Sequence, residues 1–453
     1  MVACSGGRDS LSLAYALHVL RPDYVRVVHV NHQLQQPADD WANWLQAQCE
    51  QWQLPCDVHA VTVEPGNVEA QARKARYAAL FDALQPDEIL VLGHHQQDQA
   101  ETVFLRLVAG SGVVGLSAMK VLERRQRSVL KQKNQQQDQE YHQHILLWRP
   151  LLSCSRQHIS QLAELVCPDY IDDPANFLEN FDRVFLRQKI WPLLNARWPS
   201  MDNSIGRTAT LMQDCADILN DVLHLDWQRC VEQSDAHTTN SSVIHLAELT
   251  KLSMARQRLL LSRWMQGKEQ YAPAFHLVAQ LRDQLIAARQ DANPKIVWQH
   301  WQFRRYQEQL FRLPKHLAVA TDLELSWHLG DMIDLPSGQW QWQQHEFGFS
   351  PELMQHTWQL KARRGGEVLH LQGRIGQWPL KKTLQDANLP PWQREQIHIL
   401  NTQDQLVGVF TAQGFWLNQN WVSQVQRLED KSQSQACWVE NGWLPCLVPQ
   451  SKS

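Results

Sequence analysis

Apolar and polar residues alternate with two different periods along the first 110 residues of the chain. Short β-branched or alternating runs predict four strands: VAC (2–4), VRVVHV (25–30), DVHAVTV (57–63) and EILVL (88–92). Apolar residues at helical spacing predict helices over residues 9–20, 41–52, 68–84 and 98–108. Strands joined by helical crossovers predict an α/β fold, a doubly wound parallel sheet that binds ligands at the carboxyl ends of its strands. The first strand is unusually short, which leaves open whether the natural chain starts further upstream.

The pattern changes twice more along the chain. Four segments have helical spacing: 155–194, 201–231, 255–266 and 273–290. They predict an all-α middle region that reaches Pro314. From Leu323 onward, short apolar runs between Gly and Pro turns predict a small α+β domain rich in strands, followed by a loose polar tail after Gln424. We therefore expect three domains, over residues 1–198, 199–314 and 323–424.

Composition narrows the class of protein. Of 453 residues, 43% are hydrophobic, which is enough for buried cores, and the net charge is −4. Nine cysteines without a C-x-x-C pair favour a reducing cytosol, and no apolar stretch approaches the roughly 20 residues that span a bilayer. We expect a cytoplasmic protein, not a membrane protein, whose 20 tryptophans mostly pack in cores. The polar tract KQKNQQQDQEYHQH (131–144) is expected to be a solvated loop inserted in the first domain.

The turn SGGRDS (5–10) lies between the first predicted strand and the first helix. Its glycine pair lets backbone N–H groups point at one spot, the helix N-terminus adds its dipole, and the two serines add hydroxyl donors. Such a turn can cradle an oxyanion. Asp9 in this setting either caps the helix or holds Mg²⁺. Taken alone, the turn is more simply a helix cap beside two turn glycines, and it matches neither the Walker A pattern nor G-x-G-x-x-G.

Two further segments carry polar residues near predicted strand ends. HVNHQL (29–34) contains site residues or is merely a polar exit from the strand. NVEAQARKARY (67–77) is largely explained as a capped helix with a Glu69–Arg73 pair, which leaves Arg76 over for a phosphate.

GHHQQDQAETVFLRLVAGSGVVGLSAM (93–119) is the most informative segment. Asp98 and Glu101 are three residues apart and share one helix face. Carboxylates that close repel each other unless a cation or a proton lies between them. Acidic residues in a first helical turn also complement the dipole, which is the simpler explanation. The flanking histidines and the Gly-Ser-Gly that follows favour a ligand site.

SGGRDS matches the S-G-G-x-D-S loop of the N-type ATP pyrophosphatases, and these four segments in this order resemble the tRNA(Ile)-lysidine synthetase family. Further matching segments are RPLL (149–152), IDDPANFLENFDRVFLRQKIWPLL (171–194), KARRGGE (361–367) and LKKTLQDANLPPWQRE (380–395). The resemblance implies an ATP-dependent ligase that adenylates the wobble cytidine of an isoleucine tRNA with a CAU anticodon. It then attaches L-lysine at carbon 2 of the base and releases AMP and pyrophosphate. A homodimer is left open.

The resemblance assigns roles to individual residues. Asp98 and Glu101 would hold the ammonium groups of lysine, Asp9 would help to hold Mg²⁺, and His95 and Arg76 would contact the adenylate or phosphates. The residues expected to bind ATP are Ser5, Gly6, Gly7, Arg8, Asp9 and Ser10.

RNA contacts are expected at several places. Residues 360–395 contain seven basic and three acidic residues in a protein of net negative charge, although a solvated basic face is the alternative. The expected RNA-binding residues are Arg183, Arg187, Arg363, Arg364, Lys381, Lys382, Trp392 and Arg394.

The chain departs from the family pattern at Gln97, Ala109, Ala175 and Val184, where the family commonly has Asp, Arg, Ser and Asn. The intact loop and the Asp98–Glu101 pair nevertheless predict an active enzyme. One alternative is another adenylating tRNA-modifying enzyme of this fold, such as a thiolase, but Cys4 and Cys154 do not form the required cysteine pair. The other is an inactive tRNA-binding relative.

Overall fold

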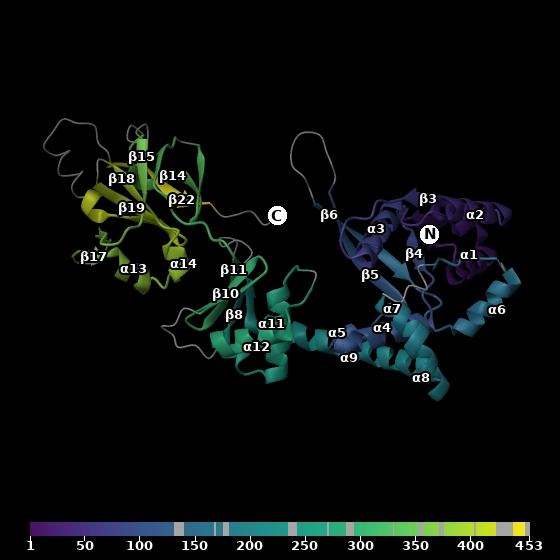
Figure 1. Ribbon diagram of the computed structural model, residues 1–453. Helices are drawn as coiled ribbons and strands as arrows, with labels where there is room; N and C mark the ends of the chain where they lie inside the picture. The colour runs from purple at the N-terminus through teal and green to yellow at the C-terminus, as the bar shows by residue number, and fades with distance from the viewer. Residues whose placement is uncertain are drawn as a thin grey trace. The chain divides into compact units, whose positions relative to one another are not determined.

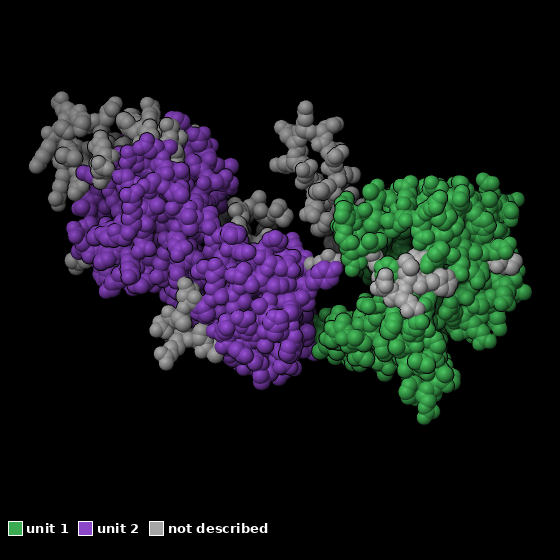
Figure 2. Space-filling view, in the orientation of Figure 1, with its two compact units in different colours: residues 1–220 green, residues 221–453 purple. Residues whose placement is uncertain are grey.

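The computed structural model describes residues 1–130, 140–166, 169–174, 181–233, 242–269, 271–286, 294–328, 330–351, 357–370, 376–402, 405–422 and 438–448. They belong to two compact units, Met1–Asn220 and Asp221–Ser453, which Figure 2 shows in different colours. No helix among the described residues is long and apolar enough to cross a membrane. The predicted domain boundaries at 198/199 and 314/323 stay predictions.

The first unit is built on a six-stranded sheet (Figure 1). Its strands are β1 (Val2–Ala3), β2 (Val27–Asn31), β3 (Cys56–Ala60), β4 (Ile89–Leu92), β5 (Leu122–Leu130) and β6 (Glu140–Trp148). The order is β3-β2-β1-β4-β6-β5, and every neighbouring pair is parallel except β5 and β6. Most of the polar tract lies outside the described residues, but its last five residues belong to β6. The predicted parallel sheet is confirmed.

Helices cover both faces of this sheet. They are α1 (Arg8–Leu20), α2 (Ala38–Gln51), α3 (Val68–Ala83) and α4 (Gln96–Val108), with a short 3-10 turn at Pro22–Tyr24. Val27 of β2 packs with α1 and α2 on one face. Its neighbour Val28 points to the other face, where it packs with Leu80 of α3. This division of the core between two faces makes the sheet doubly wound.

The rest of the first unit places the basic segment 182–190, which contains Arg183, Arg187 and Lys189, beside α4. Its helices are α5 (Val113–Leu116), α6 (Arg156–Val166), α7 (Asp182–Phe185), a π-helical turn (Leu186–Ile190), α8 (Trp191–Arg197) and the first part of α9 (Met201–Cys230), which continues past Asn220 into the second unit. Helix α6 packs along α1. Ala100 of α4 packs against the buried side chains of Leu186 and Trp191, so the residues just before and after Leu186 face the start of α4.

The sequence predicted an all-α middle region. That prediction is wrong, because the region contains both helices and a sheet and is therefore α+β. Its helices are α10 (Leu246–Leu249), α11 (Met254–Gln266), α12 (Phe275–Leu281) and a π-helical turn (Arg282–Ile286). Its sheet has the order β7-β8-β11-β10-β9, from β7 (Val231–Gln233), β8 (Ser242–His245), β9 (Lys295–Trp298), β10 (Trp301–Tyr306) and β11 (Gln309–Pro314). The tight turns between β9, β10 and β11 carry Gln299 and Gln307 at φ 52° and 51°, where Gly or Asn would have signalled a hairpin. The helices that were predicted here are present.

The C-terminal part contains two larger sheets and a two-stranded one. One sheet has the order β12-β15-β18-β19-β20: Leu323–Ser326, Thr357–Ala362, His398–Thr402, Gln405–Thr411 and Gly414–Leu417. The other contains β13 (Met332–Leu335), β14 (Gly338–Phe349), β21 (Trp438–Glu440) and β22 (Trp443–Leu447). Smaller elements are β16 (Val368–Leu369), β17 (Trp378–Pro379), α13 (Leu380–Asp386) and α14 (Pro391–Arg394). The expectation of a loose tail is therefore wrong for β21 and β22, which pair with β14.

Tryptophans fill the core of this C-terminal part. Trp327, Trp340, Trp342, Trp358 and Trp421 are buried in one cluster. The prediction that tryptophans mostly serve as core residues is confirmed for this cluster.

Candidate active site

The predicted phosphate loop follows β1 and leads into α1, at the edge of the sheet where the parallel strands end. The Ser10 hydroxyl accepts a hydrogen bond from the Ser5 N–H (3.2 Å) and donates one to the Gly7 carbonyl (3.0 Å). The Gly7 N–H lies 3.4 Å from the Ser5 hydroxyl oxygen. These contacts close the loop into a compact ring at the N-terminus of α1, where the dipole favours an anion.

Gly6 is needed for both conformation and space. Its φ is +80°, and a Cβ at this position would lie 2.2 Å from Cδ1 of Ile171. The Ile171 N–H donates to the Gly6 carbonyl (3.0 Å). The segment that contains Ile171 therefore covers the loop, which the sequence did not reveal.

Asp9 is held between two basic side chains. Arg8 Nε lies 3.0 Å from one of its carboxylate oxygens, and His95 Nε2 lies 3.5 Å from the other. Burial raises the pKa of Asp9, but the hydrogen bond from His95 and the charges of His95 and Arg8 outweigh it and lower that pKa to about 2. The Asp9 carboxylate is therefore ionised throughout the physiological range.

His95 and Asp98 cap α4. The His95 side chain accepts a hydrogen bond from the Gln97 N–H (3.2 Å), and Asp98 accepts one from the His95 N–H (3.0 Å). This reciprocal pair is a capping box, so the simpler explanation of Asp98 holds in part. His95 Nε2 is also 3.5 Å from both Asp9 and Asp98, and it links the loop to the carboxylate pair.

Two guanidinium groups lie against Asp98 and Glu101. Arg183 and Arg187 each contact Asp98 Oδ1 at 3.0 Å, and they contact Glu101 Oε2 at 3.0 and 2.8 Å. Gln97 donates to Glu101 Oε1 (3.0 Å), which shows what the departure at this position does. Glu101 is 0% exposed, so its charge depends on these partners. The cation expected between the carboxylates is supplied by the chain itself.

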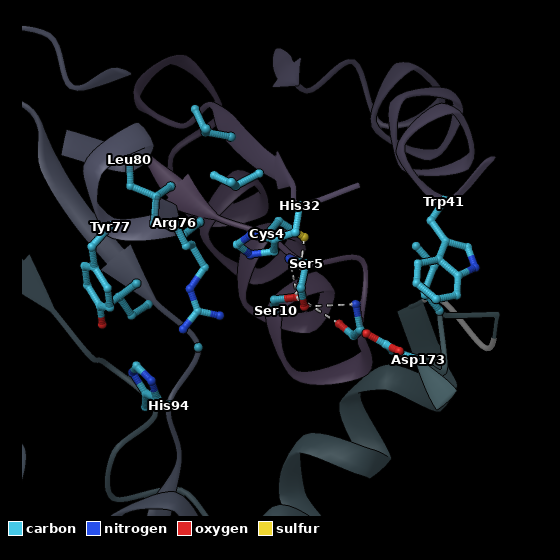
Figure 3. Close-up of a pocket in the computed structure, with 17 residues that line it drawn as sticks. Cys4, Ser5, Ser10, His32, Trp41, Arg76, Tyr77, Leu80, His94 and Asp173 are labelled. Atoms are coloured by element: carbon cyan, nitrogen blue, oxygen red, sulfur yellow. Dashed lines mark hydrogen bonds between the residues drawn. The ribbon is translucent and has the colours of Figure 1, made fainter. Parts of the chain in front are cut away.

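A pocket of about 370 Å³ opens beside the loop (Figure 3). Figure 3 shows Tyr77, Arg76 and His94 on one side of it, Trp41 and Asp173 on the other, and the loop between them. Residues lining it include Ala3, Cys4, Ser5, Gly7, Ser10, Val28, Val30, His32, Trp41, Arg76, Tyr77, Leu80, Leu92, Gly93, His94, Ile171 and Asp173.

Several polar groups in this pocket lack a partner among the described residues. They are Nδ1 of His32, Nδ1 of His94 and the Tyr77 hydroxyl. Burial lowers the pKa of His94 and also that of Arg76. A half-buried guanidinium that has no carboxylate partner in the part of the chain that the structure describes, beside unsatisfied polar groups, favours an anionic or polar ligand.

The lining of the pocket shows which of the residues singled out in the sequence reach the candidate site. His32, from the segment HVNHQL, lines it, whereas His29 bonds the Cys4 carbonyl (2.9 Å) and Asn31 donates to Asp39 (2.7 Å). Sequence reasoning missed Tyr77 and Asp173. Each lies inside a segment that matched the family pattern, Tyr77 in NVEAQARKARY (67–77) and Asp173 in the segment 171–194, and that membership was its signal.

The predicted RNA-binding residues of the C-terminal part differ in their exposure and contacts. Trp392 is 2% exposed and packs edge-on against Tyr306 and Phe311, with ring centroids 6.1 and 5.1 Å away. The prediction that it binds RNA is wrong, because its buried ring packs α14 against β10 and β11 of the middle region. Arg394 donates to the Leu389 carbonyl (2.7 Å) and to the Tyr306 hydroxyl (3.3 Å), which ties it to the same contact.

The other basic residues there stay predictions. Lys381, Lys382 and Arg364 are exposed. Arg364 pairs with Asp322, and Arg363 Nε lies 3.9 Å from Glu367.

Some predicted features lie outside what the structure describes. These are the side chain of Glu69 and residue Ala175. Among the described residues, no group of three or more His, Cys, Asp or Glu could hold a metal ion.

Comparison with known proteins identifies the family. Residues 1–194 match the model of a PP-loop domain, 245–311 that of the TilS substrate binding domain, and 358–430 that of the TilS substrate C-terminal domain. A tRNA(Ile)-lysidine synthase from Acinetobacter baylyi is 41% identical over 99% of this chain and 90% of its own length. The chain belongs to the tRNA(Ile)-lysidine synthase family.

Other tRNA(Ile)-lysidine synthases agree with this assignment. The proteins from Serratia proteamaculans and Escherichia coli O157:H7 are 34% and 31% identical, over 91% and 93% of this chain. A solved U34-tRNA thiolase, NcsA from Methanococcus maripaludis, is similar with a TM-score of 0.36 and 18% identity over 47% of this chain and 71% of its own, too low to bear on function. The PP-loop domain of this tRNA(Ile)-lysidine synthase family member is the part that contains the loop, the carboxylate pair and the pocket, and it implies the use of ATP.

Proposed function

We propose that this chain attaches L-lysine to carbon 2 of the wobble cytidine in an isoleucine tRNA with a CAU anticodon. The reaction passes through an adenylated cytidine and releases AMP and pyrophosphate. One observation carries this proposal: the loop, the Asp98–Glu101 pair and the pocket lined by Arg76, which has no carboxylate partner among the described residues, converge at one edge of the sheet. They do so in a chain that matches the family over nearly its whole length.

The loop residues Ser5 to Ser10 are proposed to bind the phosphates of ATP. Their N–H and hydroxyl groups lie at the start of α1, and Arg76 projects into the adjoining pocket, where it would contact a phosphate or the adenylate. Activation by ATP is needed because the oxygen on carbon 2 of cytosine is a poor leaving group, whereas AMP is a good one. His95 is proposed to hold Asp9 and Asp98 in place.

The loop can supply only part of the coordination of a Mg²⁺ ion. The chain offers it one ionised carboxylate at the loop, Asp9, and Mg²⁺ usually takes one or two carboxylates together with substrate phosphates. When bound, the ion would neutralise charge on the leaving pyrophosphate.

Lysine is proposed to bind at Asp98 and Glu101, with its ammonium group replacing a guanidinium contact. These carboxylates accept hydrogen bonds only, which suits an ammonium ion. The ε-ammonium first gives one proton to a carboxylate, which frees the lone pair of the nitrogen. That lone pair attacks carbon 2, the bond from carbon 2 to the oxygen of AMP breaks, and a second proton leaves the nitrogen to water. Arg183 or Arg187, once displaced, would be available to RNA phosphates.

RNA contacts are also proposed at Arg363, Arg364, Lys381 and Lys382. A cytoplasmic location is proposed because all seven cysteines that the structure describes are free thiols.

Incorporation of labelled lysine tests the function. An isoleucine tRNA transcript with a CAU anticodon is incubated with Mg·ATP, beside a methionine tRNA transcript and a reaction without ATP. ATP-dependent labelling of the isoleucine tRNA alone supports the proposal. Binding of tRNA without any label would favour an inactive relative.

Variants can distinguish two roles of the Asp98–Glu101 pair: binding lysine and positioning Arg183 and Arg187. Asp98→Asn should raise the KM for lysine and leave ATP binding unchanged. Asp40→Asn is the matched control, because Asp40 is an exposed carboxylate in the first turn of α2. If Asp98→Asn weakens only tRNA binding, the pair merely positions Arg183 and Arg187, and the lysine site lies elsewhere.

A further inference from the structure

Three guanidinium groups surround the ring of Tyr77. The guanidinium carbons of Arg73, Arg76 and Arg125 lie 5.1, 5.8 and 5.5 Å from the ring centroid. Two of these arginines come from α3 and the third from β5, so the fold assembles the group from separate elements. A ring face attracts cations, and Tyr77 therefore offsets part of their mutual repulsion.

A fourth arginine extends the group. Arg106, in the last turn of α4, donates to the Gly115 carbonyl (2.7 Å). Burial and the charge of Arg73 lower the pKa of Arg106, and the charge of Glu123 partly opposes them. We call Arg73, Arg76, Arg106 and Arg125 the Tyr77 arginine cluster.

Among the described side chains, one carboxylate forms an ion pair with a member of this cluster. It belongs to Glu123, which accepts from Arg125 at 2.7 Å and pairs with Arg149 at 2.9 Å. That single carboxylate is thus shared with a fifth arginine. Like charges this close destabilise one another unless an anion joins them, so the cluster is built to receive one.

The cluster leads from the surface into the pocket. Arg73 is exposed, Arg106 and Arg125 are half-buried, and Arg76 and Tyr77 line the pocket beside the loop (Figure 3). An anion with a single charged group would need only one of these positions. A chain of phosphates could contact several of them in succession.

The neighbouring surface is apolar. Val108, at the end of α4, and Val114, in α5, are 72% and 70% exposed. The contact of Arg106 with Gly115 ties this surface to the cluster. Exposed apolar side chains beside guanidinium groups suit unstacked nucleotides, which present both base faces and phosphates.

We propose that the Tyr77 arginine cluster binds the single-stranded RNA backbone next to the target cytidine and guides that base to the pocket. This inference rests on the proposed function, because it takes RNA as the substrate. Within the cluster, Arg73, Arg106 and Arg125 take the RNA phosphates, whereas Arg76, at the pocket, keeps the contact with a phosphate or the adenylate that the proposed function gives it. The loop binds the phosphates of ATP. Tyr77 is then a positioning residue that holds the guanidinium groups in place.

The test compares RNA binding with ATP binding. Arg73→Gln and Arg125→Gln, alone and combined, are measured for the Kd of the CAU isoleucine tRNA over a range of salt concentrations. Arg124→Gln is the matched control, because Arg124 is exposed on the same strand but points to the opposite face of the sheet.

The double variant should bind tRNA roughly tenfold more weakly at low salt. The slope of log Kd against log salt should be smaller by about 0.7 for each phosphate that the variant no longer neutralises. Its Kd for Mg·ATP and the behaviour of Arg124→Gln should equal those of the unmodified protein. An unchanged slope in the double variant, or weaker ATP binding instead of weaker tRNA binding, would overturn the inference. If the unmodified protein binds tRNA but forms no lysidine, the proposed function fails, while the slope still decides the role of the cluster.

Discussion

The buried carboxylate of Glu101 depends on arginines that are distant in the sequence. Its oxygens accept from Arg183, Arg187 and Gln97, and it is 0% exposed. From the sequence, the spacing of Asp98 and Glu101 already predicted a cation between them. The identity of that cation was not predictable, because it depends on how residues 183–187 pack beside α4 through Leu186 and Trp191.

Removing one of these guanidinium groups should destabilise the first unit. Arg187→Ala leaves a buried charge partly unpaired, and breaking a buried pair in this way costs about 3–5 kcal/mol. We expect a destabilisation near the lower end of that range, because Arg183 stays in contact with Glu101. Urea unfolding measures the change. The double variant Glu101→Gln/Arg187→Gln removes both charges and should be more stable than Arg187→Ala; the opposite order would show that the pair is not charge-coupled.

Asp9 and Asp98 should make stability depend on pH in the acidic range. Both have lowered pKa values in the folded protein despite burial: for Asp9, through the hydrogen bond and charge of His95, to about 2, and for Asp98, through the charges of His95 and Arg183. A carboxyl with a lowered folded pKa stabilises the fold above its unfolded pKa of about 4, and this stabilisation is lost as the pH falls toward its folded pKa.

The difference between the unmodified protein and Asp9→Asn isolates this contribution. Thermal unfolding between pH 5 and pH 2 should show the gap in Tm closing as the pH falls. Asp40→Asn, which removes an exposed carboxylate, is the control. A gap that stays constant down to pH 2 would contradict the low pKa of Asp9.

Helix α3 carries Arg76, Tyr77 and Leu80 of the candidate site, and its N-terminal cap stabilises the end of the helix that is farther from them. The Asn67 side chain caps it by accepting a hydrogen bond from the Ala70 N–H (3.1 Å). Asn67→Ala should cost about 1 kcal/mol. Amide exchange should accelerate in the first turn of α3, while exchange around Arg76 and Tyr77 should change much less. Equal acceleration along the whole helix would mean that the cap also fixes the site. Asn67→Asp, which keeps an acceptor, is the control.

How well an element could be predicted depended on whether its signal was local. In the first unit, strands β1 to β4 and helices α1 to α4 have local apolar patterns, and the sequence placed them. Strands β5 (LERRQRSVL) and β6 (EYHQHILLW) are polar over much of their length, and the sequence missed them. The sheet of the middle region was missed because its strands are only three to six residues long, and strands such as WQFRRY are polar at several positions. Trp392 was misjudged for a related reason: its partners Tyr306 and Phe311 are far away in the sequence.

The full chain combines two units with separate cores, and this separation can be tested from the C-terminal end. Strand β14 is 12 residues long and pairs with β21 and β22, whose Trp438 and Trp443 pack against the tryptophan cluster. Ending the chain after residue 437 removes these two strands and exposes the backbone of β14. Such an edge promotes aggregation.

We expect this truncated protein to aggregate and to lose the cooperative change of tryptophan fluorescence in the second unit, while the first unit keeps its ATP affinity. That expectation follows from the division of the chain, because the loop, the carboxylate pair and the pocket all lie in residues 1–220. Urea unfolding followed by fluorescence, together with a direct ATP binding measurement, checks both parts. Ending the chain after residue 448 is the matched control, since it keeps β22. Loss of ATP binding in the shorter protein alone would show that the first unit depends on the second for its active site.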